Sequence, residues 1–331
     1  MADASSVEAR YRIDPVFRAS LEELAAVAVS VDDVVPDTAA ARVRLEALGV
    51  ALPVAGQIAG LLRAIARDRD AWWLVTRCVA QLAERVDAPV FVRPRWPSLE
   101  RADDPLAPYL YVVAFLLAVP AVERWYCDRG VDEAIMWRTL GDLGVRMRIR
   151  ARRRNRPGLD TEQRWLTQHF TAQLFRLGRL QFNRDGWYYA PELAPLVRLT
   201  ASTSPRAVGV HIPEGGALDP GECDASFGAA SQFFRRYFEG DGFGVAVCTS
   251  WLLDEQLADY LPAESNIIRF QRRFHPLPGS TPGNEDVCRF VFDERDPLAD
   301  GVFARTSLQH AVVEHLRAGG EWRIRTGWVE L

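Results

Sequence analysis

The spacing of apolar residues changes along this chain, and that change is its strongest constraint on the fold. Before about residue 177, apolar side chains recur every three or four residues, as Leu21, Leu24 and Val27 do, which predicts helices. Beyond it, short runs rich in β-branched and aromatic residues alternate with helical stretches and predict a sheet. The sequence therefore predicts two domains, a helical one over residues 1–160 and a sheet domain over residues 161–331.

The composition excludes several kinds of chemistry. All 40 Lys+Arg residues are arginine, so no Schiff-base, P-loop or kinase lysine is available. The histidines form no HExxH pattern and the five cysteines are widely spaced, so we expect no metal and free thiols in a reducing compartment. The net charge of −4 argues against a protein built for nucleic acid.

No segment predicts export or membrane insertion. The longest apolar run, Leu110 to Val122, falls short of the roughly 20 residues that span a bilayer, and we interpret it as a buried helix. Residues Met1 to Arg12 carry charges of both signs and lack the apolar core of a signal peptide. We therefore expect a cytoplasmic protein without a membrane partner.

The densest charge run extends from Arg146 to Arg156. Its alternation of arginine with Val145, Met147 and Ile149 predicts an exposed strand. A solvated helix face is the other structural interpretation of this run. A phosphate-binding patch for a nucleic acid or an acidic cofactor is the functional alternative, and it is disfavoured because few aromatic residues interleave with the arginines.

The second half alternates strands with helices. Strands are predicted at 180–183, 187–190, 207–212, 243–253, 267–274, 287–292 and 322–328, with helices at 161–177, 219–240, 254–261 and 306–318. The first long helix has Asp219 as its N-cap and Pro220 at its first position.

The turn before that helix is a candidate phosphate site. The strand ending at His211 and Ile212 runs into a loop with two glycines, and the loop leads to the helix. Such a turn presents backbone N–H groups and the positive end of the helix dipole, which suits a pyrophosphate. An ordinary strand-to-helix turn is the alternative.

From about Arg179 to Leu331 the order of elements resembles the GNAT superfamily of acyl-CoA-dependent acyltransferases. The phrases VHIPEGGALDP, CTSWLLDEQLADYLPAESNIIRFQRRF and GGEWRIRTGWVEL resemble more closely a two-domain branch. That branch joins a helical N-acyltransferase domain to a GNAT-like domain and includes N-acyltransferases of the glycopeptide-antibiotic type and uncharacterised bacterial proteins. The resemblance implies an α+β fold, with a helical N-terminal domain followed by a mixed, mostly antiparallel sheet flanked by helices.

The resemblance also implies transfer of an acyl group from acyl-CoA to a small-molecule or peptide amine by direct attack, without a metal. In that family the splayed strand end and the following loop hold coenzyme A. One departure is that Glu214 stands where the common GNAT loop has Gln or Arg before its glycines. The cofactor-binding residues implied here are Ile212, Pro213, Gly215, Gly216, Ala217 and Leu218.

Two residues are candidates for the chemistry. His211 would be the base, because an unperturbed imidazole titrates near pH ~6.5 and it would lie beside the thioester. Tyr260 lies where GNAT enzymes often place the tyrosine that protonates the thiolate. Ser250 and Trp251 could shape the substrate pocket, although packing in the core is the favoured role of Trp251. Cys248, in mid-strand, is interpreted as a buried, inert thiol. The alternative for both His211 and Tyr260 is packing in the core.

A different class of function stays open at this point. A GNAT-like module without turnover could bind a CoA-type ligand or a protein partner, and the acidic Glu214 favours it slightly. The sequence names neither the acceptor, the acyl chain length nor the oligomeric state.

Overall fold

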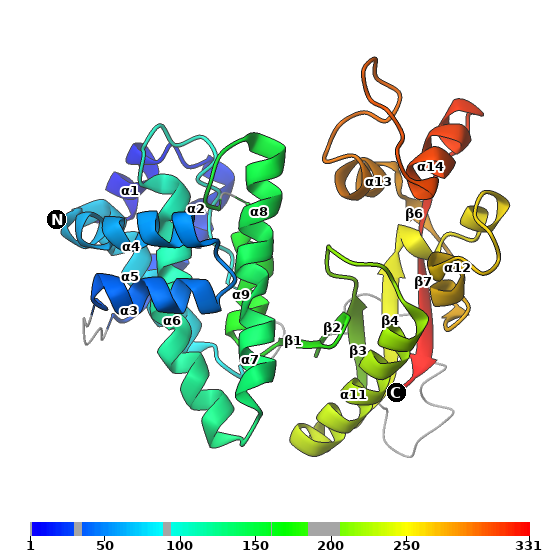
Figure 1. Ribbon diagram of the computed structural model, residues 1–331. Coiled ribbons are helices and arrows are strands. Elements are labelled where there is room, and N and C mark those ends of the chain that lie inside the picture. Colours follow the sequence, from blue (N-terminus) through cyan, green and yellow to red (C-terminus); the bar gives the residue numbers. More distant parts are fainter. Residues whose placement is uncertain (1, 30–34, 89–93, 160, 185–205) are drawn as a thin grey trace. The chain divides into compact units, whose positions relative to one another are not determined.

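The structure is a computed structural model that describes residues 2–29, 35–88, 94–159, 161–184 and 206–331 (Figure 1). The chain divides into two compact units, Met1–Phe175 and Arg176–Leu331. The division falls later than the boundary expected at residue 160, because helix α9 (Gln163–Phe170) packs against α6, α7 and α8. The strand predicted at 187–190 lies outside the described residues.

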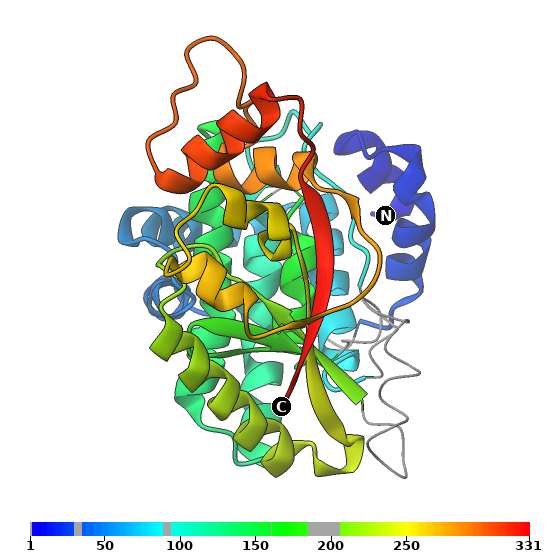
Figure 2. The ribbon, with the colours of Figure 1, turned by 90° about the vertical axis from the view of Figure 1, so that its right-hand side faces the viewer.

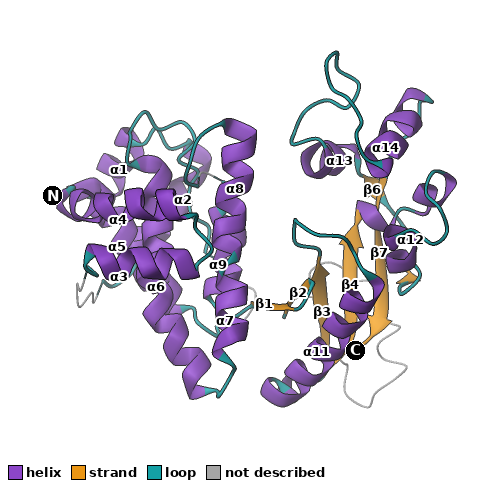
Figure 3. Ribbon diagram, viewed as in Figure 1, coloured by secondary structure: helices purple, strands orange, loops and turns teal. Residues whose placement is uncertain are grey.

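The first unit is built from helices (Figure 3). Besides α9 they are α1 (Ala4–Arg10), α2 (Arg18–Ala26), α3 (Thr38–Ala47), α4 (Leu52–Arg67), α5 (Arg69–Glu84), α6 (Ala107–Asp128), α7 (Glu133–Leu140) and α8 (Asp142–Arg154), with a short 3₁₀ turn, η1, at Pro15–Phe17. Among the described helices, α6 is long and apolar enough to cross a membrane, but most of it is buried against α3, α4, α5, α7 and α9. The prediction of a buried helix here is confirmed.

The first unit has a buried aromatic cluster in which the polar atoms of Trp96 and Tyr111 make hydrogen bonds. The ring of Trp96 lies 5.2 Å from that of Tyr111 and 5.1 Å from that of Phe115. The Trp96 indole N–H donates to Gln81 Oε1 at 2.8 Å, and the Tyr111 hydroxyl donates to the carbonyl of Pro97 at 2.7 Å. Trp96 and Tyr111 therefore add buried apolar area while their own donors are satisfied.

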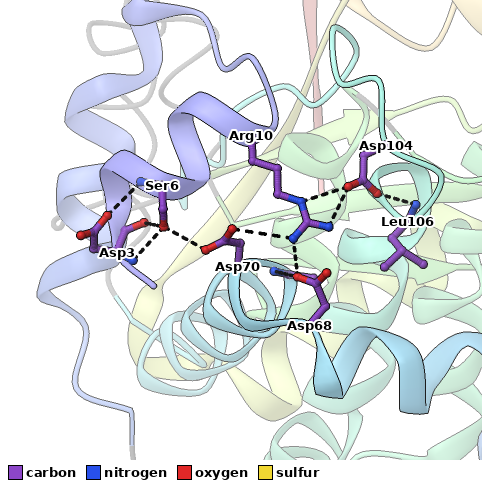
Figure 4. Close-up of polar contacts among 8 residues, drawn as sticks. Asp3, Ser6, Arg10, Asp68, Asp70, Asp104 and Leu106 are labelled. Atoms are coloured by element: carbon purple, nitrogen blue, oxygen red, sulfur yellow. Dashed lines mark hydrogen bonds and ion pairs between the residues drawn. The ribbon is translucent and has the colours of Figure 1, made fainter. Parts of the chain in front are cut away.

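Polar contacts from Arg10 and Ser6 of α1 attach the amino-terminal helix to the rest of this unit (Figure 4). Arg10 donates from Nε and Nη2 to Asp104 at 3.0 and 2.8 Å, and from Nη1 to Asp68 at 2.5 Å. Ser6 of the same helix donates to Asp70 at 2.9 Å. The bond from Arg10 lowers the pKa of Asp68 below its ordinary value, so this carboxylate stays charged across the neutral range.

The arginine-rich run is a helix, and the prediction of an exposed strand was wrong. Leu143, Met147 and Arg150 of α8 are all buried, a spacing of four and three residues that is helical. The guanidinium of Arg150 donates to the carbonyls of Arg156 and Pro157, which follow the helix. The alternation of arginine with apolar residues was thus compatible with the two-residue repeat of a strand and with the 3.6-residue repeat of a helix. The packing of the buried residues shows that the segment is a helix.

A buried polar network lies where α8 meets α9. Asp142 accepts bonds from Arg146 at 3.0 Å and Trp165 at 3.2 Å, and it lies 3.5 Å from Nε2 of His169. Asp142 and His169 are fully buried. Burial is the largest effect on His169 and lowers its pKa to about 4, against the opposing attraction of Asp142. His169 is therefore neutral in the folded protein near pH 7.

The second unit is a sheet with flanking helices. Its strands are β1 (Leu174–Leu177), β2 (Leu180–Asn183), β3 (Arg206–His211), β4 (Phe243–Ser250), β5 (His275–Pro276), β6 (Thr281–Pro282) and β7 (Arg323–Glu330), and its helices are α11 (Pro220–Tyr237), α12 (Asn266–Gln271), α13 (Asn284–Val291) and α14 (Ser307–Arg317). Strand β1 begins just before the division between the units. The described residues of this unit also contain the short 3₁₀ turns η4 (Glu239–Asp241), η5 (Trp251–Leu253) and η6 (Glu255–Asp259).

The strands follow the order β1-β2-β3-β4-β7-β5, with β6 paired to β7. Strands β3 and β4 pair in parallel, while β2–β3, β4–β7, β5–β7 and β6–β7 are antiparallel. A helical unit followed by a mixed, mostly antiparallel sheet with flanking helices is the α+β fold that was predicted. Figures 1 and 2 show α13 and α14 at the end of the sheet where β7 begins.

Five further predicted elements need correction. The stretches at 267–274 and 287–292 are the helices α12 and α13, with Ser265 capping α12 and Glu285 and Asp286 in the first turn of α13. The helix predicted at 161–177 ends at Phe170 and is followed by β1. The strand predicted to reach residue 253 ends at Ser250, and η5 begins at Trp251. The helix predicted at 254–261 is the 3₁₀ turn η6, over Glu255–Asp259.

The buried histidine predicts how stability depends on pH. An unfolded histidine takes up a proton near pH 6.5, whereas His169 in the folded unit does so only near pH 4. The contribution of His169 to the free energy of unfolding is therefore fully present above pH 6.5. It is lost as the pH falls toward 4, and the loss is about 3 kcal/mol at most. We expect urea unfolding at pH 4 to 7 to show a shallower pH dependence for His169→Gln than for the wild type.

The matched control is His310→Gln, which removes an exposed histidine of α14. It should keep the wild-type pH dependence. An equally steep loss of stability in His169→Gln would contradict the buried, neutral state of this residue.

Candidate functional site

The pairing of the two parallel strands stops before their carboxyl ends. The last pair between β3 and β4 is Val210 with Cys248, while β4 continues along β7 through Thr249 and Ser250. His211, one residue further along β3, still pairs with β2. Ligands of open sheets bind outside the carboxyl ends of parallel strands, so this end of the sheet is where a site is expected.

His211 lies on a polar patch of the sheet face. Across the β2–β3 pair, Gln181 is opposite His211 and Asn183 is opposite Gly209, so these side chains share one face. A Cβ on Gly209 would lie 2.3 Å from Asn183 Oδ1 and 3.6 Å from His211 Nε2. Glycine therefore lets the Asn183 side chain lie over the strand, close to the imidazole. His211 itself is partly exposed.

The loop after β3 leads into the amino terminus of α11. Gly215 and Gly216 have φ of +95° and +79°, a region that glycine adopts without strain. Asp219 caps the helix by accepting the N–H of Glu222 at 3.0 Å. The structure thus brings His211 together with all the predicted cofactor-binding residues, which form this loop: Ile212, Pro213, Gly215, Gly216, Ala217 and Leu218.

One arginine, absent from the sequence prediction, binds the loop from the β1–β2 turn. Arg179 donates from Nη1 to the carbonyl of Pro213 at 3.0 Å, from Nη2 to that of Gly216 at 3.0 Å and from Nε to that of Ala217 at 2.8 Å. Burial is the main influence on this guanidinium and lowers the pKa of Arg179. An arginine nevertheless keeps its charge at any physiological pH.

A buried serine attaches the same turn to α11. Ser226 Oγ accepts the backbone N–H of Arg179 at 2.8 Å and that of Leu180 at 3.3 Å, and it donates to the carbonyl of Glu222 at 2.9 Å. Ser226 is fully buried. A serine on the buried face of α11, between Cys223 and Ala230, was the signal in the sequence that could have drawn attention to this contact.

A second arginine binds the first turn of α11. Arg273, just after α12, donates to the carbonyl of Pro220 at 2.8 Å and from Nε to Asp224 at 2.8 Å. The helix amino terminus is therefore anchored on the side of α12 as well as on the side of the β1–β2 turn.

The other predicted site residues lie beyond the end of β4. Ser250 caps η5 by accepting the N–H of Leu252 at 3.1 Å, and Trp251 is buried in a core cluster formed with α12, α13 and α14. The Tyr260 hydroxyl lies 3.1 Å from Nδ1 of His315 on α14. The contacts found within the described residues place Tyr260 against α14 and Trp322, and they do not bring it to His211.

Two further observations bear on the chemistry. Burial raises the pKa of the Cys248 thiol to about 12, so Cys248 stays protonated and is a poor nucleophile. Within the described ranges, no group of three or more His, Cys, Asp or Glu side chains is arranged to hold a metal ion.

The Ser226 contact predicts a loss of stability on truncation. Ser226→Ala leaves two buried N–H groups without their acceptor, which should lower the free energy of unfolding by about 1–3 kcal/mol. Ser231→Ala on the same helix, whose hydroxyl contacts the exposed Arg235 side chain, should cost little. Urea unfolding of the three proteins tests this, and equal stability of Ser226→Ala and the wild type would contradict it.

Comparison with known proteins places both units in families. Residues 39–172 match the N-acyltransferase N-terminal domain, and residues 174–329 match the GNAT-like C-terminal domain. No curated protein matches the chain. A solved acyltransferase in complex with decanoyl-CoA is 32% identical, with a TM-score of 0.86 and 99% of each chain covered. An acyltransferase in complex with decanoyl-CoA and teicoplanin is 31% identical, with a TM-score of 0.84 and the same coverage.

These matches extend over nearly the whole chain at more than 30% identity, and they agree with the observed order of a helical unit and a mixed sheet. They confirm the resemblance that was inferred from the order of elements and from three phrases of the second half of the sequence. The chain belongs to the family of acyltransferases that join an N-acyltransferase N-terminal domain to a GNAT-like C-terminal domain.

Proposed function

We propose that this protein transfers an acyl group from an acyl-CoA thioester to an amine by direct attack. The observation that carries the proposal is the full-length similarity, at 32% identity, to an acyltransferase in complex with decanoyl-CoA. The local geometry supports it, because a glycine-containing loop at a helix amino terminus follows the strand that leaves its parallel neighbour.

Acyl-CoA would lie along the end of β3 in this proposal. The pantetheine arm would follow His211, Ile212 and Pro213, where β3 no longer pairs with β4 and backbone groups can bond to the amides of the arm. The pyrophosphate would lie at the loop residues 215–218, near the amino terminus of α11. This arrangement places the thioester beside His211.

The reaction then needs one proton removed and one supplied. The amine nitrogen attacks the thioester carbon, a C–N bond forms and the C–S bond breaks. His211 would take the proton that the nitrogen loses, and Tyr260 would give a proton to the departing thiolate, leaving an amide and free coenzyme A. The Tyr260 hydroxyl is in hydrogen-bond contact with His315, which can return a proton to it.

The ligands of the similar structures support a choice of acyl donor and of acceptor. Those proteins were solved with octanoyl-CoA, decanoyl-CoA and teicoplanin. We propose a medium-chain acyl donor and an amine on a small molecule or peptide, with a glycopeptide as the first acceptor to test. The proposal involves neither a nucleic acid nor a membrane. We place the reaction in the cytoplasm, which five free cysteines support.

The test is amide formation from decanoyl-CoA and a glycopeptide amine, followed by mass spectrometry, together with calorimetric titration of decanoyl-CoA. His211→Ala should lower kcat by about 10²–10⁴-fold, because it removes the base, while the Kd for decanoyl-CoA stays close to that of the wild type. The exposed His310→Gln variant should keep both values.

Two results would count against this account. A wild-type kcat in His211→Ala would show that another group takes the proton. Failure of the wild type to bind any acyl-CoA would contradict the acyltransferase proposal and leave an interaction module.

A further inference from the structure

We propose that Arg179 is a positioning residue that holds the loop of residues 213–218 in the form that binds the pyrophosphate. The inference rests on the proposed function. It goes beyond it by assigning a role to a side chain that lies outside the loop, on the turn between β1 and β2.

The contacts of Arg179 fix the direction of three peptide groups in the loop. Arg179 binds the carbonyls of Pro213, Gly216 and Ala217, so these three oxygens point toward its guanidinium. In a trans peptide the N–H points opposite to the C=O of the same unit, and no peptide bond in the described residues is cis. The N–H groups of the residues that follow each carbonyl therefore point away from Arg179; those residues are Glu214, Ala217 and Leu218.

The resulting surface is suited to an anion. Gly215, Gly216 and Ala217 are exposed, so the outward side of the loop is open to a ligand. Successive N–H groups beside the amino terminus of a helix form a concave anion site. Without Arg179 the two glycines could turn the same peptides in either direction, because positive and negative φ are both accessible to glycine.

The geometry of the three contacts explains why residue 179 is an arginine. A guanidinium is a planar fork that can bind three carbonyls at once, whereas a lysine ammonium cannot match that geometry. In the part of the chain that the structure describes, no carboxylate forms an ion pair with Arg179. Its positive charge therefore adds to that of the helix dipole at the place where Glu214 replaces the usual Gln or Arg.

The backbone of Arg179 is itself fixed. Its N–H donates to the buried Ser226 of α11, so the arginine, the helix and the loop form one connected unit. A Cβ on Gly178 would lie 2.7 Å from Ser226 Oγ, which shows how closely the turn approaches the helix. The backbone that carries the guanidinium is therefore held in place by α11.

The experiment compares donors with and without the diphosphate. Kinetics and calorimetry are measured for wild type, Arg179→Gln and Arg179→Lys with decanoyl-CoA and with S-decanoyl-pantetheine, which lacks the nucleotide and its diphosphate. Both variants should raise the Kd and KM for decanoyl-CoA at least tenfold. They should change the kinetics with S-decanoyl-pantetheine far less, because that donor meets only the Pro213 end of the loop. Arg272→Gln, which removes an exposed arginine just after α12, should behave like the wild type.

Each other outcome overturns the proposal. Equal affinity of the wild type and Arg179→Gln for decanoyl-CoA would show that the loop binds without this residue. Full affinity in Arg179→Lys would show that charge acts alone, without carbonyl binding. An equal loss with S-decanoyl-pantetheine would indicate general damage to the site. A wild type that binds no acyl-CoA would instead contradict the proposed function, and this inference with it.

Discussion

The parallel pairing of β3 and β4 is the constraint on which the second unit depends. Two adjacent parallel strands cannot be joined by a tight turn, so the chain must cross over between them, and α11 makes that crossing. The crossing puts the loop of residues 212–219 at the carboxyl end of β3. Strand β4 lies between β3 and β7, and its pairing with β7 continues through Ser250, beyond its last pair with β3 at Cys248, so the ladder between the parallel strands ends beside that loop. The candidate site is therefore a consequence of topology before any side chain is considered.

Arginine provides the polar contacts that hold this arrangement. In a chain without lysine, every long cation is a planar fork, and several of them bind backbone carbonyls at the ends of helices and turns. Arg179 binds the loop, Arg273 binds the first turn of α11, and Arg150 binds the segment after α8. In the first unit Arg10 donates instead to the carboxylates of Asp68 and Asp104. The arginine content thus contributes to the internal order of each unit as well as to surface charge.

The sequence predicted the parts of the site that depend on local signals. The β3 strand, the double glycine and the Asp219 cap are all encoded within a few residues, and all three were found. The helices α12 and α13 were mistaken for strands because they are short. A helical repeat is told from a strand repeat over about 11–18 residues, and both helices are shorter than that. Arg179 and Ser226 escaped prediction because they contact residues 34 to 47 positions away, and only the fold brings those together.

The central claim is that the loop after β3 receives the pyrophosphate while the thioester lies beside His211. A crystal structure of the protein with coenzyme A or decanoyl-CoA tests it most directly. The account predicts diphosphate oxygens within about 2.7–3.2 Å of the N–H groups of Ala217 and Leu218, with the sulfur near His211. A diphosphate bound elsewhere, with this loop empty, would contradict it.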